Sequence, residues 1–555
     1  MYNILIGGAA GQGVDTTAAI LEKLLKKSGY SVFTSRDFMS RIRGGHNFSL
    51  IRFGTEVLMS HSDKLDGIIA LNDETIEIHK KNLKPKGFIL CDSSFSTKDA
   101  RAVKIDMDAM ATAIGNPKVS GSIAIGAVLK LFGESLEYVN VVMKTFVKEQ
   151  YLDMNIKAVT EGYKIVEKRF PKLKGSFGDW MILSGNKAVS LGAAAAGLKF
   201  YSAYPMSPST SLMENLAEFC EKTAIVVEQA EDEIAAINMA IGASFAGARA
   251  MTGTSGGGFS LMVEALGLAG MAEIPLVVAD FQRPGPVTGF PTRTEQSDLK
   301  FVVSASQGEF PRMVIALRNH TDAFYQTIRA FNLAEKYQIP VIILSDQYLA
   351  DASATVKPFN LSNIKNVKPA QKKTGKGEYL RYKLTKDGIS PRLIPGKSKN
   401  FVSIDSDEHD ERGWITESAE MRVKMVDKRM SKLEKLQTEL QEPEYFGAEN
   451  CETLLVGWGS TYGPIAEAVK LLNNKNNQYG ALVFGDIFPL PLKLLKEKSA
   501  NAKQIINIEQ NATGQLASLI SEQTGIFCTS SILKYDGRQI SADEVVDRLR
   551  REVQK

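Results

Sequence analysis

Residues 224–246, AIVVEQAEDEIAAINMAIGASFA, hold a short apolar run followed at once by a helical pattern. The run at 224–227 is typical of a buried strand, and the small residues of 235–246 predict a helix that packs closely against its neighbours. Four acids stand between the two: Glu228, Glu231, Asp232 and Glu233. Acids in a first helical turn are favourable because they oppose the positive end of the helix dipole. The stretch therefore predicts a strand–helix unit of a parallel sheet.

Similar alternation extends outward in both directions. Apolar runs at 275–278 and 340–344 predict further strands of the same sheet, and residues 1 to about 170 alternate between strand and helix patterns. After Cys451 the alternation resumes. The sequence therefore predicts an α/β protein made of several doubly wound, mainly parallel sheet domains.

The same patterns predict where the domains begin and end. A first α/β domain is expected at 1–172, a linker at 173–181 and a second α/β domain at 182–360. Residues 361–445 are predicted to form an irregular connecting segment with one charged helix. A third α/β domain is expected at 446–555.

The composition argues against several classes of protein. The 555 residues include 67 Lys+Arg and 63 Asp+Glu, a net charge of +4 that is too balanced for a typical nucleic-acid-binding domain. The chain has no apolar run of about eighteen residues, so no membrane span is expected, and residues 1–6 are typical of a first strand rather than a signal peptide. The four cysteines and five histidines lack metal-ligand spacing, so we expect no metal site on this chain. These features predict a cytoplasmic protein.

Two N-terminal motifs allow more than one interpretation. GGAAGQGV at 7–14 lies between a strand and a helix, where glycines let backbone N–H groups approach an anion, but a tight turn explains the pattern equally well. RIRGGHN at 41–47 carries two arginines that can hold a carboxylate or a phosphate. Solvated arginines on a surface turn are the more frequent explanation of such a pattern.

Three further segments follow predicted strands. YPMSPSTS at 204–211 predicts a rigid loop that opens a helix, and helix capping explains its hydroxyl groups as well as a functional role does. TGTSGGG at 252–258 and QRPGPVTGFPTRTEQ at 282–296 concentrate glycine, hydroxyl groups and arginine. A long loop of this kind is costly to order, so we expect it to bind a ligand.

Taken in order, these motifs resemble the α subunit of the 2-oxoacid:ferredoxin oxidoreductases, in the fused γ–α form typical of 2-oxoglutarate:ferredoxin oxidoreductase. The resemblance covers nearly the whole chain, including DGISPR at 387–392, DEHD at 407–410, KMVDKR at 424–429 and NIEQN at 507–511. It implies a γ-type first domain, a second domain of the pyrimidine-binding type found in thiamine enzymes, and a third domain like the transketolase C-terminal domain.

The resemblance implies an activity shared with a partner. Family members oxidatively decarboxylate a 2-oxoacid with coenzyme A, yielding acyl-CoA, carbon dioxide and reduced ferredoxin, and thiamine diphosphate does the carbon chemistry. In the family, the Mg²⁺-diphosphate motif and the cysteines of a 4Fe-4S cluster lie on a separate β subunit, and this sequence shows neither pattern. The expected substrate is 2-oxoglutarate or a broader set of 2-oxoacids. The expected partners are that β subunit and ferredoxin, with no nucleic acid and no membrane.

The resemblance also assigns roles to five residues. Glu231 stands where the family has the glutamate that contacts the aminopyrimidine ring nitrogen of thiamine diphosphate, and Ser207 replaces a family threonine near cofactor and substrate. Arg283 and Thr292 match loop positions that face the 2-oxoacid. Arg43 matches a basic position, often Lys in relatives, that is linked to the distal substrate carboxylate. Arg keeps that charge but offers a broader hydrogen-bonding fork, so the preferred chain length stays open.

Two alternatives stay open. A different branch of the family, acting on indolepyruvate or branched-chain 2-oxoacids, differs from the first interpretation only in its substrate. A non-catalytic nucleotide-binding module that uses the glycines at 7–14 as a phosphate loop belongs to another class of function. The near-absence of an acidic ribose-binding residue after a second strand argues against it, although Asp37 is a loose candidate.

Overall fold

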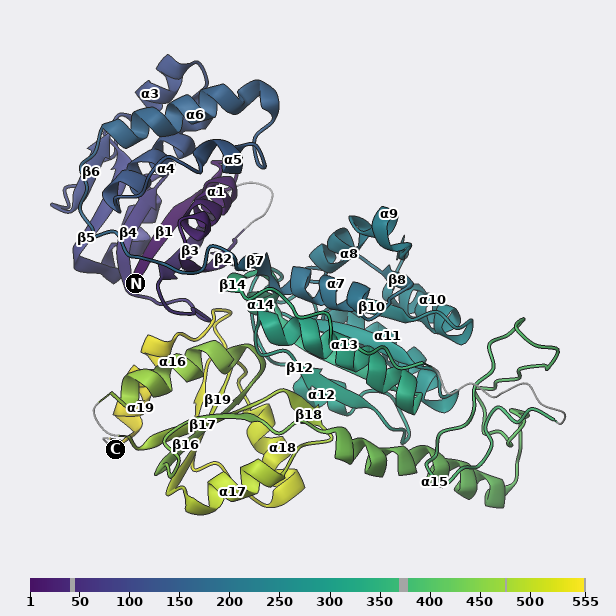
Figure 1. Cartoon of the computed structure of the whole chain (residues 1–555). Coiled ribbons are helices and arrows are strands. Elements are labelled where there is room, and N and C mark those ends of the chain that lie inside the picture. Colours follow the sequence, from purple (N-terminus) through teal and green to yellow (C-terminus); the bar gives the residue numbers. More distant parts are fainter. Residues whose placement is uncertain (40–44, 369–377, 475–476, 554–555) are drawn as a thin grey trace. The chain divides into compact units, whose positions relative to one another are not determined.

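The computed structural model describes residues 1–39, 45–368, 378–474 and 477–553 (Figure 1). The chain divides into two compact units. The first contains Met1–Ser184, Asp351–Pro358 and Ser541–Glu544, and the second contains the other described residues. None of the described helices is both long and apolar enough to cross a lipid bilayer.

The first unit is built on a mixed eight-stranded sheet in the order β6-β5-β4-β1-β3-β2-β14-β7. Neighbours among β1, β4, β5 and β6 are parallel, and the remaining neighbours are antiparallel. The strands are β1 (Tyr2–Ala9), β2 (Ser31–Asp37), β3 (His46–Gly54), β4 (Leu65–Ala70), β5 (Leu83–Asp92), β6 (Ala102–Ile105), β7 (Met181–Ser184) and β14 (Ser353–Val356). The helices are α1 (Val14–Lys27), α2 (Asp73–His79), α3 (Met107–Ile114), α4 (Ser120–Leu131), α5 (Val139–Met143) and α6 (Glu149–Lys164).

One strand of this sheet arrives late in the chain. β14 pairs with β2 on one side and β7 on the other, so residues 353–356 belong to the first sheet although they follow β8 to β13 of the second sheet in the sequence. These residues are compatible with a strand in either sheet, because short β-branched and small residues suit both. The domain boundaries given above stay predictions.

The second unit contains a seven-stranded sheet in the order β18-β12-β13-β11-β10-β8-β9, parallel except for β18. Helices α7 and α13 pack together on one face, and α10 and α11 pack together on the other (Figure 1). The strands are β8 (Phe200–Ala203), β9 (Val226–Gln229), β10 (Ala250–Thr254), β11 (Leu276–Gln282), β12 (Met313–Ala316), β13 (Pro340–Asp346) and β18 (Asp486–Phe488). The helices are α7 (Gly185–Ala195), α8 (Thr210–Ala217), α9 (Cys220–Thr223), α10 (Glu233–Phe245), α11 (Gly256–Met271), α12 (Leu299–Val303), α13 (His320–Tyr337) and α14 (Gln347–Asp351).

A five-stranded sheet completes the second unit, in the order β15-β17-β16-β19-β20 and parallel except for β15. One apolar core runs from the seven-stranded sheet into this one. The strands are β15 (Glu444–Gly447), β16 (Thr453–Trp458), β17 (Tyr479–Phe484), β19 (Gln504–Glu509) and β20 (Ser530–Leu533). The helices are α16 (Tyr462–Leu472), α17 (Lys493–Asn501), α18 (Gln515–Thr524) and α19 (Ala542–Val553), whose residues up to Glu544 belong to the first unit.

The three sheets confirm the predicted α/β class: the seven- and five-stranded sheets are mainly parallel, and the eight-stranded sheet is mixed. The apolar runs at 275–278 and 340–344 form β11 and β13, both fully buried. The run at 224–227 differs from the prediction. It gives β9 at the sheet edge, where Val226 is 55% exposed, because an edge strand is covered on one side only.

The connecting segment after residue 361 is anchored through one buried acid. Glu273 is fully buried and accepts hydrogen bonds from Lys428 and Lys432 of helix α15 (Ala419–Leu436). The guanidinium of Arg381 donates to the Glu273 carbonyl. Although burial opposes it, these cations hold the pKa of the Glu273 carboxyl well below its usual range. Lys428 of the KMVDKR motif and Lys432, which follows the motif, therefore fasten α15 to the seven-stranded sheet domain, since a buried carboxylate requires paired charges.

Candidate active site

The carboxyl ends of β8, β9, β10 and β11 carry the segments singled out in the sequence. Because these strands are parallel, their loops leave from one edge of the sheet, where open α/β sheets bind ligands. The loop after β8 contains Ser207, and α10 begins just after β9. The loop after β11 contains Arg283. Nη1 of Arg283 donates to the Ser207 carbonyl over 2.8 Å, which joins two of these loops directly.

Glu233 places a buried carboxylate at the carboxyl ends of these strands. It is the first residue of α10, after the N-cap Asp232, whose side chain accepts from the amide of Ala235 over 2.7 Å. The Glu233 side chain is buried, and its Oε1 has no hydrogen-bond partner among the described residues. Burial and the neighbouring Asp232 raise the pKa of the Glu233 carboxyl, while Arg283 acts in the opposite direction. A buried, unpaired carboxylate oxygen is costly unless a ligand or water completes it.

Gly258 makes room for this carboxylate. A Cβ at position 258 would lie 2.1 Å from Oγ1 of Thr254 and 2.4 Å from Oε1 of Glu233. Real side chains do not approach so closely, so any other residue would displace one of the two. The glycine run 256–258, which opens α11, therefore gives the Glu233 carboxylate its space.

Glu231, the residue assigned from the sequence, lies elsewhere. It occupies the turn between β9 and α10, and its side chain is exposed. The structure thus separates two acids that stand only two places apart in the sequence. Helical periodicity distinguishes them: the buried stripe of α10 contains Glu233, Ala236, Ile237, Ala240, Ile241 and Ser244. That spacing was available in the sequence and is the pattern that could have pointed to Glu233. The role given to Glu231 stays a prediction.

The other assigned residues fall into three groups. Ser207 and Arg283 are brought together, and both are half-buried. Thr292 is half-buried further along the loop after β11, and its substrate contact stays a prediction. Arg43 lies outside the described residues. Nε of Arg283 is buried without a partner in the part of the chain that the structure describes.

Asp298 interacts electrostatically with Arg283 and with two further acids, Asp280 and Glu295. Asp280, at the end of β11, is fully buried, and neither of its carboxylate oxygens has a partner within the described ranges. Burial and the nearby Asp298 raise its pKa well above the usual value. Burial likewise raises the pKa of Asp298 to about 6 and that of Glu295 to about 7. Protonated carboxyls are therefore expected here near neutral pH.

Asp280→Asn is expected to stabilise the protein at neutral and alkaline pH. An acid with a raised pKa keeps its proton in the folded chain at pH values where the unfolded chain has lost it. The free energy of unfolding therefore falls as pH rises from about 4 through the raised pKa, and the asparagine removes that part of the slope. Thermal unfolding between about pH 5 and about pH 8 measures the difference. An equal loss of stability in both proteins over that range would show that Asp280 does not carry this proton.

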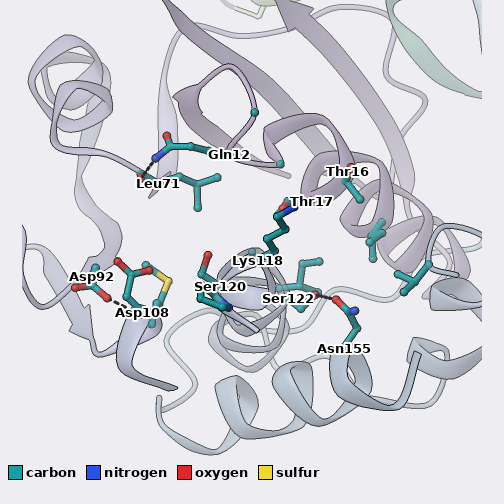
Figure 2. A pocket seen from close by; sticks show the side chains of 18 of the residues that line it. Gln12, Thr16, Thr17, Leu71, Asp92, Asp108, Lys118, Ser120, Ser122 and Asn155 are labelled. Atoms are coloured by element: carbon teal, nitrogen blue, oxygen red, sulfur yellow. Dashed lines mark hydrogen bonds between the residues drawn. The ribbon is translucent and has the colours of Figure 1, made fainter. Parts of the chain in front are cut away.

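A cavity of about 440 Å³ lies at the glycine loop of the first unit (Figure 2). Gly11 and Gly13 adopt positive φ values of 94° and 79°, with open space where a Cβ would stand. Gln12 holds the loop, since its Nε2 donates to the Leu71 carbonyl over 3.2 Å. Lys118 and the hydroxyl groups of Thr16, Thr17, Ser120 and Ser122 also line the cavity. Backbone N–H groups at the start of α1, hydroxyls and one lysine are groups that bind phosphate, whereas the carboxylates of Asp92 and Asp108, which also line the cavity, oppose an anion.

Models of the pyruvate:ferredoxin oxidoreductase families match three parts of the chain. The one described as pyruvate flavodoxin/ferredoxin oxidoreductase, thiamine diP-binding, matches residues 191–428. The one described as pyruvate ferredoxin/flavodoxin oxidoreductase matches 3–165. Core domain II of pyruvate:ferredoxin oxidoreductase matches 451–545.

Individual proteins agree with these matches. A 2-oxoacid:ferredoxin oxidoreductase subunit alpha from Sulfolobus sp is 34% identical over 98% of this chain and 96% of its own. A 2-oxoglutarate synthase subunit KorA from Methanocaldococcus jannaschii is 36% identical over 59% of this chain and 88% of its own. A solved 2-oxoglutarate:ferredoxin oxidoreductase from Magnetococcus marinus, with 2-oxoglutarate, coenzyme A and succinyl-CoA bound, covers 100% of this chain and 99% of its own at 31% identity, with a TM-score of 0.94. This chain therefore belongs to the α subunits of the 2-oxoacid:ferredoxin oxidoreductases.

Proposed function

We propose that this chain, with a β subunit, oxidatively decarboxylates a 2-oxoacid in the presence of coenzyme A and passes the electrons to ferredoxin. We take the substrate to be 2-oxoglutarate, which the solved Magnetococcus enzyme holds together with coenzyme A and succinyl-CoA. The observation that carries the proposal is the buried, unpaired carboxylate of Glu233 beside Arg283. We place the enzyme in the cytoplasm, where free cysteines stay reduced.

The residues at the sheet edge fit the pyrimidine ring of thiamine diphosphate. Oε1 of Glu233 is an acceptor without a partner in the described chain, as a protonated ring nitrogen requires. Bound there, thiamine diphosphate would supply a nucleophilic carbon and a sink for the electrons released when the 2-oxoacid loses carbon dioxide. The chain's own carboxylate would hold a proton at the ring nitrogen and so favour the imino tautomer, whose nitrogen is basic. We assign this role to Glu233 rather than Glu231, because water competes with the ring nitrogen for the carboxylate of an exposed acid.

Exposed apolar side chains around Glu233 support a site shared with a partner subunit. Four of them lie on the elements that carry the site: Ile234, Leu261, Val287 and Phe290. Val287 is 84% exposed, so a subunit that covered it would remove apolar surface from water. We propose that the β subunit, which would hold the diphosphate, Mg²⁺ and the 4Fe-4S cluster, covers these residues and excludes water from the Glu233 carboxylate.

The basic residues provide the substrate contacts in this proposal. Nε of the Arg283 guanidinium is buried without a partner in the described chain, so this group can hold the carboxylate next to the reacting carbonyl. Ser207 and Thr292 supply hydroxyl groups on the same two loops. Arg43 is proposed to hold the distal carboxylate of 2-oxoglutarate.

The experiment that tests the proposed function uses the complex purified with its thiamine-carrying partner. Ferredoxin reduction is measured with coenzyme A and, in turn, 2-oxoglutarate, pyruvate, indolepyruvate and a branched-chain 2-oxoacid. A kcat/KM highest for 2-oxoglutarate supports the proposal. A higher value for indolepyruvate or the branched-chain acid moves the chain to that branch of the family, and no turnover with any of them contradicts an oxidoreductase role.

We also propose that the cavity at the glycine loop takes the phosphate-bearing nucleotide part of coenzyme A. Lys118→Ala is expected to weaken coenzyme A binding by about tenfold, because it removes one charge-assisted phosphate contact. Calorimetric titration of the isolated chain measures this. Lys157→Ala, which changes an exposed lysine outside the cavity lining, is the matched control. Unchanged affinity in the Lys118 variant would exclude the site, and tighter binding of NAD or ATP than of coenzyme A would favour the nucleotide-binding alternative.

A further inference from the structure

Gln296 joins the substrate loop to the five-stranded sheet through every polar group that it has. Its backbone N–H donates to the Gln510 carbonyl over 2.7 Å, and its Nε2 donates to the Trp458 carbonyl over 2.9 Å. Its Oε1 accepts from the Gln510 amide over 3.2 Å, and its carbonyl accepts from Nδ2 of Asn511 over 3.0 Å. The side chain is fully buried. Four hydrogen bonds to one surface fix both the position and the orientation of this residue.

The residues of the five-stranded sheet domain that bond Gln296 are themselves held by a buried acid. Glu509, at the end of β19, is fully buried and accepts from Nε1 of Trp458 over 2.9 Å and from Nδ2 of Asn511 over 2.8 Å. It also accepts from the amide of Leu516 at the start of α18. Glu509 thus holds Trp458 and Asn511, two of the three residues that Gln296 contacts.

The loop is closed at its base by a second set of bonds. The amide of Asp298 donates to Oε1 of Gln282 over 2.9 Å, and Gln282 directly precedes Arg283. Nε2 of Gln282 in turn donates to the Ser345 carbonyl of β13 over 2.9 Å. Both ends of the loop that contains Arg283 are therefore pinned, one to the seven-stranded sheet and one, through Gln296, to the five-stranded sheet.

We infer that Gln296 is a positioning residue for the 2-oxoacid, and that the five-stranded sheet contributes to catalysis by fixing the loop that holds Arg283. The inference rests on the proposed substrate role of Arg283. Gln296 itself touches no reacting atom. It acts by restricting the loop to the conformation in which the guanidinium reaches both Ser207 and the substrate, because a loosely held loop would spend less time in that geometry.

The test compares two variants of the full complex. Gln296→Met keeps the volume of the side chain and removes its two side-chain hydrogen bonds. Asn473→Leu is the control: Asn473 lies on the same sheet domain, where its side chain makes three hydrogen bonds to Gln478 and Tyr479, away from the loop. Hydrogen exchange of amides 284–295, thermal stability, and kcat and KM for the 2-oxoacid are measured in both.

Gln296→Met is expected to speed exchange in 284–295 by about tenfold or more and to lower kcat/KM by about tenfold, with KM rising. Asn473→Leu is expected to lower thermal stability while leaving loop exchange and kcat/KM within about twofold. Unchanged loop exchange in Gln296→Met, or an equal fall in kcat/KM in the control, would overturn the inference. A wild-type complex that oxidises no 2-oxoacid would instead refute the proposed function, and the exchange result would still show whether Gln296 holds the loop.

Discussion

In the assembled enzyme, Glu233→Gln is expected to lower the rate of 2-oxoacid-dependent ferredoxin reduction by about 10²–10⁴-fold. The amide has nearly the volume of the acid, so the packing of α10 against its neighbours should survive. What is lost is the negative charge that stabilises a proton on the ring nitrogen of thiamine diphosphate. Single-turnover and steady-state ferredoxin reduction, with the thiamine content of the complex determined in parallel, measure the effect.

Glu231→Gln provides the matched comparison. It makes the same chemical change two positions away, on an exposed side chain, and is expected to alter the rate by less than about threefold. A large loss in the Glu231 variant with normal turnover in the Glu233 variant would restore the role that the family resemblance gives to Glu231. Equal, large losses in both would show that the acidic turn as a whole is needed.

Arg283→Ala is expected to lower kcat/KM for the 2-oxoacid by about 10²-fold. The change removes the proposed partner of the substrate carboxylate, and it also leaves the Ser207 carbonyl without its donor. Most of the loss should appear in KM if Arg283 binds the substrate equally in the ground state and the transition state. Steady-state kinetics across a wide range of 2-oxoacid concentrations separates the two parameters.

Arg283→Lys tests whether charge alone is enough. Lysine keeps the positive charge but lacks the planar fork that can contact Ser207 and the substrate together, so an intermediate loss is expected. A lysine variant as slow as the alanine variant would show that geometry dominates. An alanine variant with unchanged kcat/KM would remove Arg283 from the substrate site.

Much of the fold follows from patterns that are local in sequence. The runs that became β11 and β13 were predictable because both strands lie inside a parallel sheet, where continuous apolar residues are required. β9 was predicted as buried but lies at the edge, since the order of strands is set by contacts between distant segments. The pairing of β14 with β2 also joins segments that are distant in the sequence, so the residues of β14 alone do not predict it.

In the candidate site, too, some features follow from local sequence and others depend on contacts between distant segments. Ser207 and Arg283, predicted separately, are joined by a hydrogen bond. Glu233 could have been found from the buried stripe of α10, because its position is a matter of helical period. Gln296 could not, because its four partners are contributed by residues 458, 510 and 511, which only the folded chain brings together.

The proposed role of Glu233 can be measured directly as the exchange rate of the thiazolium C2 proton of thiamine diphosphate bound to the purified complex. Rapid dilution into deuterated solvent, followed by an acid quench and NMR, measures it without any 2-oxoacid, coenzyme A or ferredoxin. We expect exchange to be slowed by about 10²-fold or more in Glu233→Gln and to stay close to the wild-type rate in Glu231→Gln. Wild-type exchange in the Glu233 variant would contradict the proposed role, because the buried carboxylate would then have no part in activating the coenzyme.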